Sequence, residues 1–130
     1  MRSPGSENVT FHLKWPNDVL AGGGKLAGVL LEAETVAQGR LAGVGGTGAN
    51  VAAAPEGMPY PAISLRDIGI DINAKDLYRT LTKAWAEFRA IWDKGRGFGE
   101  IRRLWLERAA GVGQHVSIRS DSSTISGLFD

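Results

Sequence analysis

Glycine is concentrated in the first half of this chain, and that concentration limits how this half can fold. The sequence holds 18 glycines in 130 residues, about twice the usual share of ~7%. Nine of the 18 lie between Gly22 and Gly48, with no low-complexity repeat. Glycine weakens regular elements and suits places where the backbone turns tightly or approaches a ligand closely. We therefore expect turns and close backbone contacts here, and we look for the functional site in this half.

Alternation of apolar and polar residues predicts three strands in the glycine-rich half. Residues 9–14 read as a short strand that ends at Pro16, which donates no backbone hydrogen bond. The three glycines at 22–24 mark a tight turn. Residues 25–33 and 40–51 then read as two strands, which we expect to pair as a hairpin.

The second half changes from a period of two to a period of 3.6, which is typical of helices. Apolar residues from position 77 recur on one helical face, after a predicted N-cap at Asn73 and before a stop at Gly95. A second helix should end near Gly111. Residues 116–118 and 125–129 read as two short strands around a serine-rich turn.

Composition excludes several classes of function. Fifteen Lys and Arg against fourteen Asp and Glu give a net charge of +1, which favours neither nucleic-acid nor membrane binding by bulk charge. The chain has no cysteine and two histidines, so disulfides, thiolate zinc sites and multi-histidine metal centres are excluded. No apolar run approaches the roughly 20 residues of a membrane span, and the first residues do not resemble a signal peptide. We therefore expect a cytoplasmic protein.

The first motif of interest is Lys-Trp-Pro-Asn-Asp at 14–18. A proline turn that leaves a strand presents the amide of Asn17 and the carboxylate of Asp18 together. Such a pair can hydrogen-bond a base or hold Mg²⁺ near phosphates. The alternative is a plain turn in which both side chains bond their own backbone.

The second motif is Lys-Leu-Ala-Gly-Val-Leu-Leu-Glu at 25–32. Lys25 opens an apolar strand and can neutralise a carboxylate or a phosphate. Gly28 leaves room for a ligand against the strand backbone. The alternative is a solvated lysine at a strand end and a glycine that packing requires.

The third motif, Gly-Val-Gly-Gly-Thr-Gly-Ala-Asn at 43–50, contains a formal G-x-G-x-x-G. A dinucleotide site of that type needs a helix to begin at the glycines. Residues 49–54 run into Pro55 and leave too little chain for such a helix. A strand of the form G-x-G-x-N fits better, in which Gly46 and Gly48 flatten one face beside a ligand and Asn50 reads a base edge.

The order and spacing of these motifs resemble the biotin protein ligase family, from about Phe11 onward. The resemblance implies an α/β (α+β) fold, with a mixed β-sheet and packed helices of the class II synthetase-like ligase type. It further implies a division into a disordered N-terminus at 1–10, a partial catalytic domain at 11–111 and the start of a small β-barrel-like domain at 112–130.

The resemblance also implies a reaction and a set of residues. Ligases of this family join biotin to ATP as biotinyl-5′-AMP and then transfer biotin to a lysine of the biotin carboxyl carrier protein. By its match, Lys25 is the catalytic lysine and binds biotin together with Gly28. The residues expected to bind ATP are Asn17, Asp18, Gly46, Gly48 and Asn50, and Asp18 is the expected Mg²⁺ ligand.

The chain departs from the family at both ends. Family members carry a Gly-Arg-Gly-Arg-x-Gly-Arg loop upstream of the Lys-Trp-Pro-Asn-Asp motif, and nothing like it precedes Phe11. The sequence thus reads as the C-terminal half of a ligase catalytic domain, truncated at both ends, inactive alone or active as a homodimer. A non-catalytic nucleotide-binding or interaction module on the same scaffold is the alternative.

Overall fold

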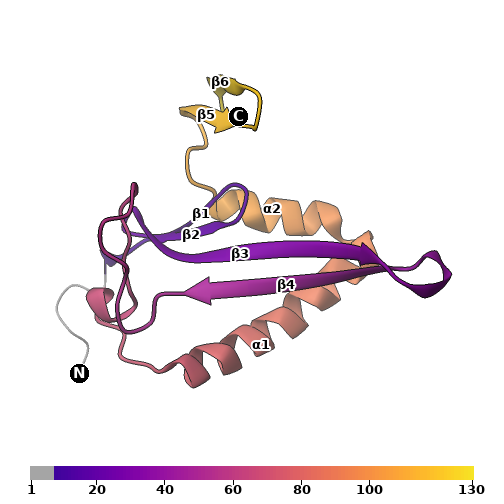
Figure 1. Cartoon of the computed structure of the whole chain (residues 1–130), viewed down its shortest axis with the longest axis horizontal. Helices are drawn as coiled ribbons and strands as arrows, with labels where there is room; N and C mark the ends of the chain where they lie inside the picture. The colour runs from indigo at the N-terminus through magenta and orange to yellow at the C-terminus, as the bar shows by residue number, and fades with distance from the viewer. Residues whose placement is uncertain (1–7) are drawn as a thin grey trace.

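The computed structural model describes residues 8–130, and its first half is a four-stranded sheet (Figure 1). The strands are β1 (Phe11–Lys14), β2 (Asp18–Ala21), β3 (Gly24–Thr35) and β4 (Leu41–Ala49). Two helices follow, α1 (Ala74–Trp92) and α2 (Phe98–Arg108). Strands β5 (His115–Arg119) and β6 (Thr124–Leu128) form a separate two-stranded sheet.

The four strands lie in the order β1-β2-β3-β4, and every neighbouring pair is antiparallel. The prediction of a mixed sheet is therefore wrong for the part of the chain that the structure describes. The reason is the length of the connections, because short turns join antiparallel neighbours, whereas a parallel pair needs a crossover of about a dozen residues. Parallel pairing occurs there only as the isolated bridges Leu13–Ala109 and Lys25–Ala62.

The predicted hairpin is confirmed, since β3 and β4 pair without interruption from Ala27–Ala49 to Thr35–Leu41. Strand β2 is an addition that the pattern did not predict. It is only four residues long and lies between a proline turn and a glycine turn. A segment so short shows no clear alternation of apolar and polar residues. Gly22 and Gly23 have φ values of 55° and 83°, so this turn needs residues that tolerate the left-handed region.

The buried core is small and lies at the end of the sheet where β3 begins. Its buried apolar members are Ala21, Leu26, Leu65 and Ile68, joined by partly buried neighbours that include Val9. Residues 1–7 of the predicted disordered N-terminus lie outside the described residues. The division into domains at 10 and 111 stays a prediction.

Helix α1 begins at the predicted cap. The Asn73 side chain accepts a hydrogen bond from the Asp76 amide at 2.9 Å, and the Asp76 side chain accepts one from the Asn73 amide at 3.5 Å. The helix ends at Trp92, three residues before the predicted Gly95, because Asp93 takes the left-handed conformation at its C-cap. None of the helices between residues 8 and 130 combines the length and apolarity needed to cross a membrane.

Candidate active site

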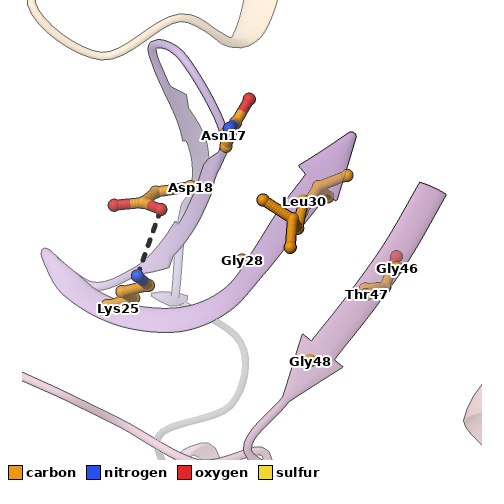
Figure 2. Close-up of a pocket in the computed structure, with 9 residues that line it drawn as sticks. Asn17, Asp18, Lys25, Gly28, Leu30, Gly46, Thr47 and Gly48 are labelled. Carbon is orange, nitrogen blue, oxygen red and sulfur yellow. Dashed lines mark ion pairs between the residues drawn. The ribbon is translucent and has the colours of Figure 1, made fainter. Parts of the chain in front are cut away.

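An open cavity of about 530 Å³ lies over the glycine-rich face of the sheet (Figure 2). This volume falls within the roughly 300–1,000 Å³ that is usual for small-molecule sites. Six of the seven residues predicted from the motifs line it, together with three that were not predicted. The lining residues are Asn17, Asp18, Lys25, Gly28, Val29, Leu30, Gly46, Thr47 and Gly48.

The strand register explains why residues from three separate motifs meet here. Asp18 of β2 lies opposite Gly28 of β3, and Gly28 lies opposite Gly48 of β4. Two residues further along, Leu30 lies opposite Gly46. Because directly opposed residues project from the same face of a sheet, these positions form one surface. The two glycines of β4 leave that surface flat next to the side chains of β2 and β3.

Lys25 and Asp18 form an ion pair at the edge of this surface. The Lys25 Nζ lies 3.2 Å from the Asp18 Oδ1, and both side chains are about 30% exposed. A register shift between Val19 and Leu20 interrupts the ladder beside Lys25, and such irregularities re-aim side chains. Figure 2 shows the two charged groups pointing toward each other, with Asn17 turned away from them. A partly exposed pair of this kind adds at most modest stability, so an anionic ligand can compete with Asp18 for the ammonium.

Gly28 lies against this ion pair. A Cβ atom at this position would stand 3.4 Å from the Lys25 Cε, 3.5 Å from the Nζ and 3.7 Å from the Asp18 Oδ1. Those distances are ordinary contacts, so the fold itself tolerates a small side chain here. Any larger side chain would occupy the part of the cavity beside the ammonium.

Asn50 has a different setting from the other predicted residues. Its Nδ2 donates hydrogen bonds to the backbone oxygens of Lys25 at 3.3 Å and Ile63 at 3.1 Å. It lines a smaller adjoining cavity of about 90 Å³. The structure thus gives Asn50 a role in holding two chain segments together, and its contact with a base stays a prediction.

Besides Leu26 and Ala27 of the second motif, three residues that sequence reasoning missed line the small cavity, Pro55, Tyr60 and Ala62. They come from the loop after β4, which has three prolines and no periodicity from which a position could be inferred. Lys25, Gly28 and Gly48 line both cavities, so the lysine stands at their boundary.

The residues from 8 to 130 offer no preformed metal centre. No group of three or more His, Asp or Glu side chains converges there, and Asp18 is the one acidic residue that lines the larger cavity. A single carboxylate suits Mg²⁺ only when a ligand brings further oxygens, as phosphates do.

The G-x-G-x-x-G at 43–48 lies entirely within strand β4. No helix begins at these glycines, so the geometry of a dinucleotide-binding turn is absent from this described segment. The choice of a strand over a Rossmann turn is thereby confirmed.

Comparisons with known proteins agree with this geometry. No protein-family model matches the chain. The chain is 36% identical over 124 residues to the biotin--[acetyl-CoA-carboxylase] ligase of Paracoccus denitrificans, across 91% of this chain and 51% of the relative. It is 49% identical over 78 residues to the same-named protein of Mycobacterium tuberculosis, across 60% of this chain and 27% of the relative.

Among solved structures, the biotin protein ligase of Aquifex aeolicus in complex with biotin and ATP superposes with a TM-score of 0.73 at 29% identity. The match covers 91% of this chain and 49% of that structure. The chain is a homologue of the biotin protein ligases. It spans about half the length of the Paracoccus denitrificans ligase.

Proposed function

We propose that this ligase homologue supplies the lysine-bearing half of a biotin adenylation site in an ATP-dependent biotin–protein ligase. The observation that carries the proposal is the single surface formed by Asp18, Lys25 and Gly28 with the glycines of β4. The names of the curated relatives and the biotin- and ATP-bound structural neighbour support the same reaction.

The proposed first step is an attack of a biotin carboxylate oxygen on the α-phosphorus of ATP. A new oxygen–phosphorus bond forms, the bond to the pyrophosphate leaving group breaks, and biotinyl-5′-AMP results. Carboxylate and phosphate repel each other, so a cation held between them lowers the barrier. Lys25 fits that role because it lines the cavity and its ion pair with Asp18 is partly open to solvent. A preorganised donor of this kind is worth roughly 10²–10³ in rate.

In the proposed second step, a lysine amine of the biotin carboxyl carrier protein attacks the carbonyl carbon of the mixed anhydride. The amide C–N bond forms, the bond between the carbonyl carbon and the phosphate oxygen breaks, AMP leaves and the amine releases a proton to solvent. The carrier lysine needs access from solvent, which the open cavity provides. Gly28 would lie beside biotin, and Asn17, Gly46 and Gly48 beside the nucleotide.

The proposal includes Mg²⁺ as the ion bound to the phosphates of ATP. Asp18 is the lining carboxylate that would hold it, together with phosphate oxygens. The ion would neutralise phosphate charge when bound, and no step by this chain's own residues depends on its position.

Biotin-dependent exchange between ATP and labelled pyrophosphate tests the proposal. We expect exchange with the parent chain, a loss of about 100-fold or more in Lys25→Ala, and no loss in Lys83→Ala on the surface of α1. Equal exchange in the parent and Lys25→Ala would refute the role of the lysine. Nucleotide binding without any exchange would identify the alternative, a non-catalytic binding module.

A further inference from the structure

Lys25 has a second neighbour besides Asp18. Its Nζ lies 5.1 Å from the centre of the Tyr60 ring, over the face of that ring. Asp18 approaches the ammonium from the larger cavity, and Tyr60 lines the smaller one. The lysine ammonium therefore has two neighbours of different kinds, a carboxylate and an aromatic face.

The loop that carries Tyr60 is tied to the backbone of Lys25 itself. The Lys25 amide donates to the Pro61 oxygen at 2.8 Å, and the Ile63 amide donates to the Lys25 oxygen at 3.0 Å. Asn50 bridges the same two segments through its side-chain amide. Tyr60 directly precedes Pro61, whose oxygen accepts the first of these hydrogen bonds. The Tyr60 ring therefore has a fixed place beside the lysine.

We propose that Tyr60 is a positioning residue that holds the Lys25 ammonium at the boundary of the two cavities. This inference rests on the proposed role of Lys25 in adenylation. An aromatic face attracts a cation through its quadrupole and carries no net charge. Tyr60 therefore steadies the ammonium without neutralising it, so the lysine stays in place when an anionic ligand displaces Asp18.

Selective labelling of lysines tests this in the full chain without substrate. The rate at which an amine-acylating reagent modifies Lys25 is measured by peptide mass spectrometry, relative to Lys83 in the same molecule. The aromatic face holds and covers the Lys25 side chain, so its loss leaves the amine more open to the reagent. Losing a cation–π contact at an exposed site corresponds to about a two- to fivefold change.

We expect Tyr60→Leu to label two- to fivefold faster at Lys25 and Tyr60→Phe to label at the parent rate, because phenylalanine keeps the aromatic face. The chain has one other tyrosine, Tyr78 on α1, and Tyr78→Leu is the matched control that should change nothing. An unchanged rate in Tyr60→Leu, or an equal acceleration in Tyr60→Phe, would overturn the proposal.

Two further measurements keep the result interpretable. If Tyr60→Leu fails to fold, the Tyr60→Trp variant tests the proposal instead. The stronger aromatic face of tryptophan should slow the labelling of Lys25 below the parent rate. A rate equal to or faster than that of the parent would overturn the proposal. In the exchange assay, Tyr60→Phe should retain the parent rate while Tyr60→Leu loses it. Absence of exchange in the parent would refute the proposed adenylation. The labelling rates would still test whether Tyr60 positions the Lys25 ammonium.

Discussion

At the scale of single residues, the site depends on how charge and empty space are distributed along three strands. Lys25 and Asp18 provide a cation and its resting partner at 3.2 Å, and Gly28 leaves the adjoining space free. These residue types and their spacing were predictable from the sequence, and six of the seven predicted residues share one cavity. The role of Asn50 in bridging two backbone segments could not be predicted, because its acceptor at position 63 belongs to a loop without periodicity.

The space beside the ion pair gives the first prediction. A Gly28→Val substitution should leave the melting temperature nearly unchanged, because a β-branched residue suits a strand, while it weakens biotin binding at least about tenfold. Isothermal titration calorimetry with biotin measures the effect. Gly45→Val is the matched control, since Gly45 pairs with Leu31 on the other face of the hairpin. Equal binding by Gly28→Val and the parent would show that biotin does not lie there.

Asp67 gives a second prediction, on pH. Hydrogen bonds from the backbone amide and the hydroxyl of Ser64, with the backbone bond the larger cause, lower the pKa of the Asp67 carboxyl. The stability contributed by this charged form is therefore present above the unfolded-state pKa of about 3.9 and is lost as pH falls through the lower folded-state pKa.

The free energy of unfolding should differ between the parent and Asp67→Asn by more at pH 7 than near pH 3. The reason is that acid removes the carboxylate charge from the parent only. Urea unfolding at both values measures it. A difference that is constant with pH would contradict the assignment.

At the scale of elements, local sequence decided the helices and the long hairpin. The Asn73–Asp76 capping box starts α1 as predicted, and the glycine-broken strands pair in full register. Strand β2 escaped prediction because four residues between two turns show no period, and its antiparallel pairing also corrected the expected mixed sheet.

The capping box gives a third prediction. An Asn73→Ala substitution should lower the free energy of unfolding by about 1 kcal/mol, since the Asp76 amide loses its acceptor. Denaturant unfolding followed by far-ultraviolet circular dichroism measures this loss. Lys83→Ala within the same helix is the control and should stay within about 0.5 kcal/mol of the parent. An equal effect in both variants would show that the cap contributes nothing specific.

At the scale of the whole molecule, the apolar stripe of α1 lies largely exposed, although its periodicity marked it as an inner face. Tyr78 and Trp85 are 69% and 68% exposed, and Leu30 and Leu31 of β3 are 63% and 71% exposed. Periodicity identifies an apolar face, and it cannot tell what covers that face. Exposed apolar surface of this extent favours association.

The fourth prediction is that the chain self-associates through this stripe in a concentration-dependent manner. Sedimentation velocity should show Trp85→Lys shifted toward the monomer relative to the parent at equal concentration. Ala90→Lys adds the same charge on the opposite side of α1 and should sediment like the parent. A monomeric parent, or equal shifts in both variants, would contradict the stripe as the contact surface.

If the Lys25 cavity is a biotin adenylation site, as we propose, it should bind the product of the first step. The measurement is calorimetric titration of the 130-residue chain with a non-hydrolysable analogue of biotinyl-5′-AMP, beside Lys25→Ala and Lys83→Ala. We expect binding by the parent and Lys83→Ala, and binding at least about tenfold weaker in Lys25→Ala, which equals 1.4 kcal/mol. Equal affinity in all three chains, or no binding by the parent, would contradict it.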